Sequence, residues 1–185
     1  MSKAVFDFTF ALLLMLLFSI LILFGFLIAA LDTSSNGFFF QTRIGKNGKP
    51  FQIIKLRTIH PKKNTCSVVG KILRKSKLDE LPQLWNVLCG DMSFVGPRPD
   101  VPGYYDKLTG ENRKILLLKP GITSEAALKY ANEEELLSKQ KNPKEFNDLV
   151  LFPDKVKMNL DYYYNHTFSR DLKIILKTVL PKFHK

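Results

Sequence analysis

The hydrophobic pattern of the chain is dominated by one long apolar run near its N-terminus. From Ala11 to Leu31 every residue is apolar except Ser19, and Gly25 is the only position that weakens a helix. A helix needs about 20 apolar residues to cross the hydrocarbon core of a bilayer. The pattern therefore predicts a membrane helix, and the run is longer than the apolar centre of a cleaved signal peptide.

After this run the apolar positions fall into shorter groups. Aromatic and β-branched residues at Gly37–Gln41 and Phe51–Thr58 flank the turn-forming sequence Gly45–Gly48, which predicts a β-hairpin. Helical spacing of apolar residues recurs after residue 80, near 111–118 and in the last third of the chain. We therefore expect an α+β fold, with a membrane helix at residues 1–32 and a small, mostly helical domain with a short β-hairpin at 33–185.

Two helices are expected in the last third. Val156, Leu160 and Tyr163 line one side of the first. The second carries Lys173 and Lys177 on one face and an apolar stripe on the other, made of Leu172, Ile175, Leu176 and Val179. Both core packing and docking onto the membrane surface fit this stripe, and core packing is favoured.

The formal net charge of +11 indicates an anionic partner, which the charge alone leaves open between nucleic acid, a membrane surface and a phosphorylated substrate. Almost all Lys and Arg residues follow the apolar run, so the positive-inside rule places the C-terminal domain on the cytoplasmic side. Cys66 and Cys89 are expected to be reduced thiols there. The histidines His60, His166 and His184 are scattered and give no support to a histidine-based mechanism.

The sequence Lys77–Gln83 places two adjacent carboxylates, Asp79 and Glu80, where a helix is expected to begin. Apolar residues follow at helical spacing, at Leu81, Leu84, Trp85 and Leu88. Pro82 is tolerated only in a first turn, which puts the N-cap at or near Asp79. The helix dipole would then favour an ionised carboxylate and a nearby phosphate, although these seven residues also fit an ordinary Asp cap.

A second candidate is Arg98, in the segment Gly90–Pro99. Two glycines and two prolines leave little room for regular structure, so we expect a stiff loop. Because Pro97 and Pro99 flank Arg98, little entropy is lost in presenting its guanidinium to a phosphate or carboxylate. Arg74, shortly before the carboxylate pair, is a further candidate to hold a phosphate.

Seven features occur in one order along nearly the whole chain: the N-terminal membrane helix, Arg43–Phe51, Lys55–Thr58, Leu78–Gln83, Gly90–Pro99, Pro120–Thr123 and Asp161–Tyr163. This order resembles the bacterial sugar transferases known as monotopic phosphoglycosyl transferases. The resemblance implies transfer of a sugar 1-phosphate from a UDP-sugar to polyprenyl (undecaprenyl) phosphate, with release of UMP and a requirement for Mg²⁺. That reaction is the first membrane-committed step in making a surface glycan.

The resemblance also implies roles for individual residues. Asp79 is implied to be the nucleophile, which carries the phosphosugar as a covalent intermediate, and the Mg²⁺-associated carboxylate. Glu80 is implied to act in the acceptor step or in positioning. Substrate contacts are implied for Lys55, Arg57, Arg74, Gln83, Arg98 and Asp161. The excess of Lys and Arg agrees with a diphosphate substrate, whose charge cations and Mg²⁺ must offset.

By the same resemblance, the helix is re-entrant in the bacterial inner (cytoplasmic) membrane, and the catalytic domain lies at its cytoplasmic face against inner-leaflet lipids. The sequence departs from the family pattern at Ser19–Ile20, where the family has Ser-Pro, but a serine can still bend a helix by bonding a carbonyl one turn back. The linker between Thr58 and Arg74 is shorter, and Ser124 replaces a glycine. The sugar, the glycan pathway and the oligomeric state are not specified by the sequence.

A different class of protein also fits the composition. A single membrane anchor could carry a basic binding module for anionic lipid or nucleic acid, with Asp79 and Glu80 serving only as a cap. The aromatic runs Phe38–Phe40 and Tyr162–Tyr164 do not alternate with basic residues as a base-stacking surface would, so we expect no nucleic-acid partner.

Overall fold

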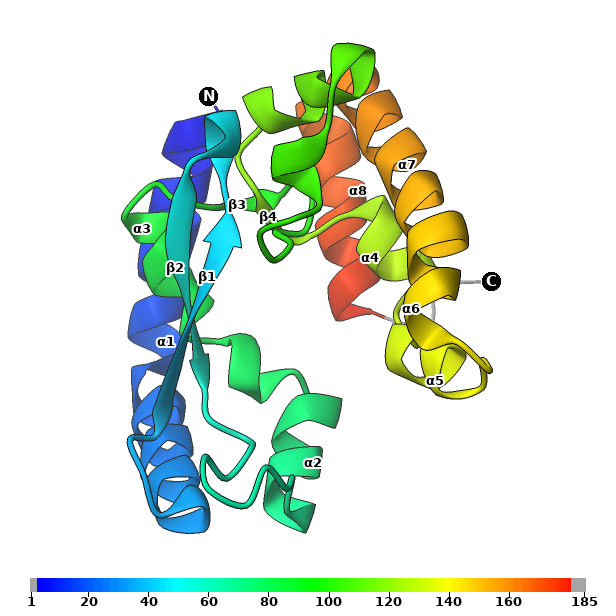
Figure 1. The fold of residues 1–185 in the computed structure, drawn as a ribbon. Coiled ribbons are helices and arrows are strands. Elements are labelled where there is room, and N and C mark those ends of the chain that lie inside the picture. The colour runs from blue at the N-terminus through cyan, green and yellow to red at the C-terminus, as the bar shows by residue number, and fades with distance from the viewer. Residues whose placement is uncertain (1–2, 181–185) are drawn as a thin grey trace. The chain divides into compact units, whose positions relative to one another are not determined.

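A computed structural model of the protein describes residues 3–180 (Figure 1). By its contacts the chain divides into two compact units. The first takes in the chain up to Arg43 and Pro50–Met92, and the second takes in Ile44–Lys49 and the chain from Ser93 onward. The boundary expected after residue 32 separates membrane from cytoplasm, whereas these contacts group the N-terminal helix with the segments that follow it.

The first unit is built on helix α1, Lys3–Thr33, one continuous α-helix of 31 residues. By length and composition it can cross a membrane, with a mean hydropathy of 3.0 in its most apolar window. Its buried residues recur at about one-turn spacing along one narrow side and are Asp7, Ala11, Gly25, Ala29 and Thr33. Most of its large apolar side chains are exposed, as expected for a helix that faces lipid. The hydroxyl of Ser19 donates to the carbonyl of Leu16 at 2.9 Å, which is the backbone bond expected of this serine.

Two strands form the expected hairpin beside this helix. Strands β1, Phe38–Ile44, and β2, Pro50–Leu56, make a two-stranded sheet. Their connection is a short 3₁₀ turn, Lys46–Gly48, in which Asn47 and Gly48 have φ of 60° and 75°. Asparagine and glycine are the residues that tolerate this left-handed backbone, which explains why the turn falls where the sequence indicated.

The core of the first unit lies where α1 meets β2. Ala29, Leu56 and Leu73 are buried there, with Phe26, Phe38 and Leu78 packed against them. A Cβ on Gly25 would lie 2.6 Å from Cδ1 of Leu56, so glycine at this position permits the close approach. The glycine that weakens the apolar run as a helix is thus the residue that lets the helix pack.

Helix α2, Val68–Lys75, leads from the hairpin toward the carboxylate pair. Ser67 caps it, because its hydroxyl oxygen accepts from the N–H of Gly70 at 2.9 Å. The same hydroxyl donates to Oδ2 of Asp32 at 2.7 Å and so ties the start of α2 to the end of α1. A 3₁₀ turn η2, Leu78–Glu80, and helix α3, Gln83–Leu88, complete the unit.

The second unit has a small parallel sheet near its centre. Strand β3, Ser93–Val95, pairs with β4, Gly121–Thr123, with Ser93 opposite Gly121 and Val95 opposite Thr123. The prediction of an irregular loop over 90–99 was therefore wrong at β3. A three-residue strand is too short to show alternation, and its hydrogen-bonding partner lies far along the chain.

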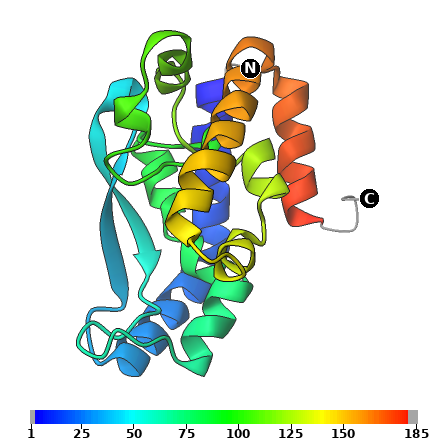
Figure 2. The same ribbon diagram turned by 45° about the vertical axis from the view of Figure 1, so that its right-hand side comes forward.

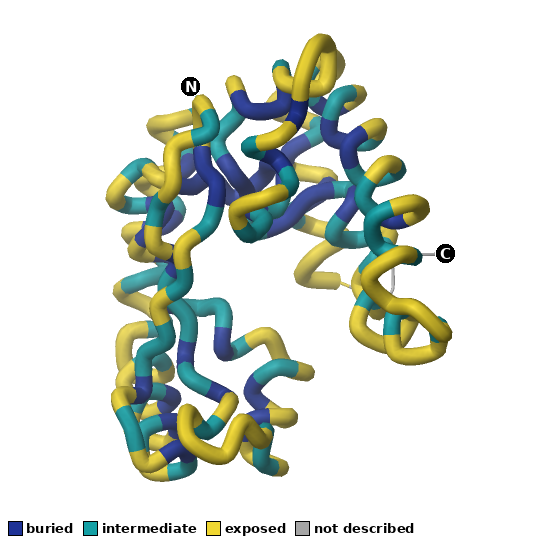
Figure 3. The backbone as a smooth tube through the Cα atoms, in the orientation of Figure 1, coloured by how far each residue is buried: buried dark blue, intermediate teal, exposed yellow. Residues whose placement is uncertain are grey.

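Helices and 3₁₀ turns surround this sheet. They are η3 Tyr105–Lys107, η4 Gly110–Leu117, α4 Glu125–Lys129, α5 Glu133–Ser138, α6 Pro143–Phe146, the π-helical turn η5 Asn147–Leu151, α7 Phe152–Asn165 and α8 Phe168–Val179. The helical patch expected at 111–118 is present, as a 3₁₀ helix. Helix α4 packs against both α7 and α8 (Figure 2), while the α5–α6 segment is mostly exposed, as expected for its charged sequence (Figure 3).

The core of the second unit lies between η4 and α7. Its buried members are Ile44, Tyr105, Leu108, Ile115, Leu116 and Val156, with Phe152 and Leu160 packed against them. The expected core stripe of α8 was wrong in part. Asp171 and Ile174 are the buried residues of that helix, and Leu172, Leu176 and Val179 are exposed. Docking onto a membrane surface, the second interpretation of this stripe, stays open.

Candidate active site

The carboxylate pair lies in a 3₁₀ turn and not at the start of an α-helix. Lys77 adopts a left-handed backbone, φ 58°, which ends the α2 segment and starts the turn that holds Asp79 and Glu80. Helix α3 begins only at Gln83, and its N-cap is Pro82, which makes no side-chain capping bond. The predicted Asp79 cap was therefore wrong, and a three-residue turn supplies no helix dipole of the kind expected for it.

Burial is the main influence on the pKa of Asp79, which is 8% exposed. Loss of solvation raises the pKa of this carboxyl above its usual value of 3.8, and the neighbouring charge of Glu80 raises it further. The charges of Lys55, Lys77 and Arg74 act in the opposite direction. Without a helix dipole, it is these three cations that support the ionised form, and the pKa still lies above its usual value.

Glu80 is held by an ion pair that crosses to the hairpin. Nζ of Lys55, on β2, lies 3.1 Å from Oε1 of Glu80, and the two side chains are only 17% and 12% exposed. A pair this well buried is screened little by solvent, so it fixes where Glu80 points. The structure thus brings Asp79, Glu80, Lys55 and Arg74 close together in the first unit, and their roles in a site stay predictions.

Asn86 is a residue of this site that the sequence analysis missed. It is 2% exposed, and its carboxamide forms hydrogen bonds with the backbone of β2, as a neighbouring strand would. Oδ1 accepts from the N–H of Ile54 at 3.1 Å, and Nδ2 donates to the carbonyl of Gln52 at 2.7 Å. Asn86 thereby holds α3 against β2, the strand that carries Lys55. An amide between the apolar residues of a short helix was the signal that sequence reasoning could have used.

Two other residues of the first unit, Arg57 and Gln83, were predicted to contact substrate. The guanidinium of Arg57 donates to the carbonyls of Asn36 at 2.9 Å and Phe38 at 3.2 Å, and it lies over the ring of Phe39. This holds the start of β1 to the end of β2. Gln83 is fully buried on α3, four residues after Asp79.

Arg98 and Asp161 belong to the second unit. Nη1 of Arg98 donates to the carbonyl of Ile122 on β4 at 3.4 Å. Asp161 forms an ion pair with Arg170, whose Nη2 lies 2.6 Å from Oδ2 of Asp161. Hydrogen bonds from Arg170 and from Asn165 lower the pKa of Asp161.

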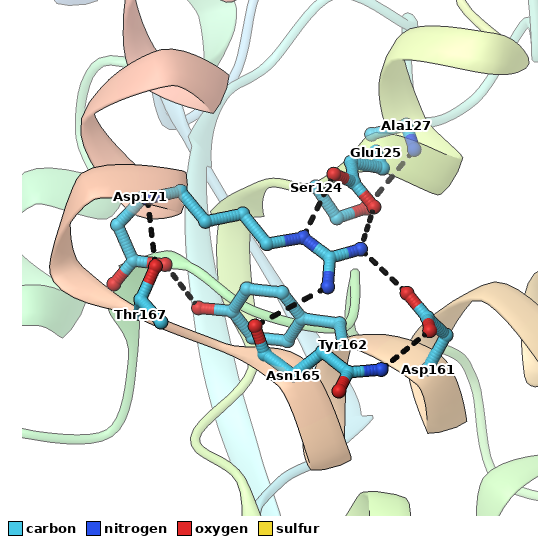
Figure 4. A network of polar contacts seen from close by, with 9 residues as sticks. Ser124, Glu125, Ala127, Asp161, Tyr162, Asn165, Thr167 and Asp171 are labelled. Carbon is cyan, nitrogen blue, oxygen red and sulfur yellow. Dashed lines mark hydrogen bonds and ion pairs between the residues drawn. The ribbon is translucent and has the colours of Figure 1, made fainter.

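The ion pair of Asp161 is part of a larger network (Figure 4). Arg170, on α8, also donates from Nε to Oε1 of Glu125 at 3.0 Å and forms a second ion pair to the other oxygen of Glu125 at 2.5 Å. The hydroxyl of Tyr162 donates to Asp171. This network fixes the residues just after β4 to the end of α7 and the start of α8.

The carboxylate of Asp79 is a type of ligand that Mg²⁺ uses. Among residues 3–180 no cluster of three or more His, Cys, Asp or Glu side chains is placed to hold a metal ion. Mg²⁺ commonly uses one or two carboxylates together with substrate phosphates and water. Oδ1 of Asp79 is buried and has no hydrogen-bond partner among the described residues, so a carboxylate oxygen is available.

Comparison with known proteins shows the family to which the chain is similar. The family model for bacterial sugar transferases matches residues 1–185. A UDP-glucose:undecaprenyl-phosphate glucose-1-phosphate transferase of Caulobacter vibrioides is 36% identical over 97% of this chain and 68% of its own length. The uncharacterized sugar transferase EpsL of Bacillus subtilis is 35% identical over 96% of this chain and 85% of its own. A Klebsiella pneumoniae protein with the same name as the Caulobacter one is 34% identical over 83% of this chain, which covers 34% of that protein.

The long apolar helix α1 is consistent with membrane association, and the carboxylates Asp79 and Glu80 have cations beside them. The chain belongs to the bacterial sugar transferase family. The resemblance seen in the sequence is confirmed.

Proposed function

We propose that this protein transfers a sugar 1-phosphate from a UDP-sugar to undecaprenyl phosphate, releases UMP, and so starts the synthesis of a surface polysaccharide. The observation that carries the proposal is Asp79: a buried carboxylate with one unpaired oxygen, beside three cations, in a chain of the sugar transferase family. Relatives named for this reaction align over most of the chain.

In the first half-reaction, a carboxylate oxygen of Asp79 attacks the phosphorus that carries the sugar. A bond forms between that oxygen and the phosphorus, the bond from the phosphorus to the bridging oxygen breaks, and UMP leaves with the electron pair. The sugar phosphate then remains on Asp79 as an acyl phosphate. Lys55, Lys77 and Arg74 support this step, because they favour the ionised carboxylate and offset the charge of the diphosphate.

In the second half-reaction, an oxygen of undecaprenyl phosphate displaces Asp79 and takes the sugar phosphate. Glu80 is held by Lys55 beside the nucleophile, which suits a role in orienting the acceptor. When bound, Mg²⁺ would supply positive charge to the diphosphate, and Asp79 is the residue that would hold it.

The site acts at the membrane surface in this proposal. Helix α2, next to the carboxylate turn, exposes Val68, Val69 and Ile72 and also carries Lys71 and Lys75. Exposed apolar residues beside lysines fit an interface with anionic lipid. By the positive-inside rule the domain lies at the cytoplasmic face, and by family resemblance α1 re-enters that face.

The test is UMP release from a panel of UDP-sugars by the purified protein with undecaprenyl phosphate in detergent. Release with one or more sugars is expected, and a membrane-anchored binding module would release none. Labelled UMP should also exchange into the UDP-sugar without any lipid, because the first half-reaction runs alone. Exchange that strictly needs the lipid would replace the covalent mechanism by direct transfer.

A further inference from the structure

Two buried polar atoms near the nucleophile have no hydrogen-bond partner among residues 3–180: Oδ1 of Asp79 and Nε2 of Gln83. Gln83 is 1% exposed, so bulk solvent does not reach its carboxamide. Buried donors and acceptors are paired in most proteins because an unpaired one loses its hydration without compensation. An unpaired group in a native structure therefore calls for a functional explanation, and here two occur within one short segment.

The two short elements that carry these residues pack against the same strand, β2. Hydrogen bonds from Glu80 N to Lys77 O, from Leu81 N to Leu78 O and from Leu84 N to Leu81 O run from the carboxylate turn into α3. Leu81 and Pro82, between the two elements, have right-handed helical angles. The hydrogen bonds join residues three apart, as in a 3₁₀ turn, so they connect the two short elements without making one α-helix. Turn η2 and helix α3 both pack against β2, the strand that carries Lys55, so Asp79 and Gln83 are buried in one neighbourhood.

Helix α3 also contains a buried amide whose role is structural, and the comparison is informative. Both polar atoms of Asn86 are paired, with Ile54 and Gln52. The fold therefore satisfies a buried carboxamide where it serves packing. Gln83, one turn earlier, is as deeply buried, yet its N–H₂ group is left without an acceptor.

The two unpaired groups are complementary to one substrate group. A phosphoryl group under attack accepts a carboxylate oxygen at phosphorus and accumulates negative charge on its nonbridging oxygens. A neutral N–H donor stabilises those oxygens and leaves the charge of the nucleophile intact. A lysine ammonium in the same place would pair with the carboxylate and neutralise it. Glu80, next to Asp79, is an acceptor held by Lys55, and the amide of Asn86 is already paired, so neither supplies that donor.

We infer that Gln83 is a catalytic residue, whose Nε2 donates a hydrogen bond to a nonbridging oxygen of the phosphoryl group as that group moves onto and off Asp79. This inference rests on the proposed function. It assigns the unpaired donor to the reacting group and not to the uridine, the sugar or the lipid.

The experiment compares Gln83→Met with Gln83→Glu. Methionine is similar in length and has no N–H, and glutamate keeps the shape but replaces the donor by an acceptor. For both variants we expect kcat and the lipid-free UMP exchange to fall by about 10²-fold or more, the loss that follows when an enzyme loses one hydrogen-bond donor to its transition state. The KM for UDP-sugar should change only a few-fold.

Thermal unfolding separates this role from packing. Because Gln83→Met removes an unpaired buried donor, its unfolding temperature should equal or exceed that of the wild type. The matched control is Asn86→Leu, which leaves the N–H of Ile54 and the carbonyl of Gln52 without their hydrogen-bond partner. This variant should have a lower unfolding temperature than the wild type.

Three outcomes would overturn the inference. The first is a Gln83→Met protein with kcat within threefold of the wild type. The second is a Gln83→Glu protein more active than Gln83→Met, which would show that the carboxamide oxygen, and not its N–H₂ group, acts on the substrate. If Gln83→Met fails to fold, near wild-type exchange by folded Gln83→Glu is the third. A wild-type protein that releases no UMP from any UDP-sugar contradicts the proposed function itself, which is a separate result.

Discussion

At the scale of single residues, the ionisation of Asp79 is the quantity on which the chemistry depends. Burial and Glu80 favour the protonated form of its carboxyl, and Lys55, Lys77 and Arg74 favour the charged form that attacks phosphorus. A carboxyl whose burial opposes its ionisation lowers the stability of the fold when it ionises.

The first prediction concerns that destabilisation. The folded-state pKa of Asp79 is raised above 3.8, so this group contributes stability that is present below that pH and lost as pH rises through the raised pKa. Asp79→Asn, which cannot ionise, should therefore unfold a few degrees above the wild type at pH 7, since about 1 kcal/mol corresponds to about 2–4 °C in a chain of this size. It should release no UMP.

Thermal unfolding at several pH values checks this prediction. The difference between Asp79→Asn and the wild type should shrink toward acid pH. Asp91→Asn is the matched control, because Asp91 is exposed in the same unit, and it should leave the unfolding temperature unchanged. An Asp79→Asn protein that is less stable than the wild type at pH 7 would show that the carboxylate is a stabilising group.

The second prediction concerns Arg98. If its guanidinium grips a phosphate in two-point fashion, Arg98→Lys keeps the charge, loses the planar pair of donors, and should lower kcat/KM by about tenfold or more. Arg113→Lys is the control, since Arg113 also donates to a backbone carbonyl of the second unit, that of Leu108. Equal activity of Arg98→Lys and wild type would remove Arg98 from the site.

At the scale of elements, charged and polar contacts join several helix ends of the second unit. Arg170 on α8 contacts Glu125 of α4 and Asp161 of α7, and its guanidinium lies over the ring of Tyr162. The hydroxyls of Thr123 and Thr178, 2.7 Å apart, join β4 to the far part of α8. Asp161, predicted to bind substrate, has this network as its surroundings, and its substrate contact stays a prediction.

The third prediction tests the network as a structural device. Arg170→Met should lower the free energy of unfolding by about 1–2 kcal/mol, because two carboxylates lose a charged donor while their partial exposure limits the loss. Lys139→Met is the control, since Lys139 pairs with Glu135 on an exposed helix surface, and it should cause no measurable change. Denaturation in detergent measures both. Equal stability of the two variants would mean that the Arg170 pairs add nothing.

At the scale of the whole molecule, the question is how α1 sits in the bilayer. A helix of 31 residues is longer than the roughly 20 that a spanning segment needs, and it has no proline to break it. Its one hydroxyl within the apolar run bonds back to Leu16 and is the feature available to bend it.

The fourth prediction is that both ends of α1 face the cytoplasm. A cysteine at Ser2, which lies outside the described residues, in a protein with Cys66 and Cys89 replaced by serine, should react with an impermeant thiol reagent only from the cytoplasmic side. Lys62→Cys, in an exposed loop of the first unit, marks the side of the domain. Labelling of the Ser2 position only from the outside would show that α1 spans the membrane, and would leave the enzymatic proposal intact.

Much of this protein was determined by its sequence alone. Twenty-one nearly uninterrupted apolar residues predict a membrane helix without reference to any partner, and the Asn47–Gly48 turn predicts the hairpin, because both signals are local. The ordered motifs indicated the family, which the comparisons confirm. Lys55 and Glu80 could also be named in advance from those motifs.

Only the tertiary structure decided the state of these residues. Local rules gave Asp79 a helix cap and a dipole, whereas its burial and the charge of Lys55 come from segments distant in sequence, and only Lys77 and Arg74 are near it along the chain. The β3–β4 pairing, the hold of Asn86 on β2 and the unpaired N–H of Gln83 are equally non-local. Burial and hydrogen-bond satisfaction depend on what the folded chain brings alongside a residue, and no pattern of neighbours along the sequence contains that information.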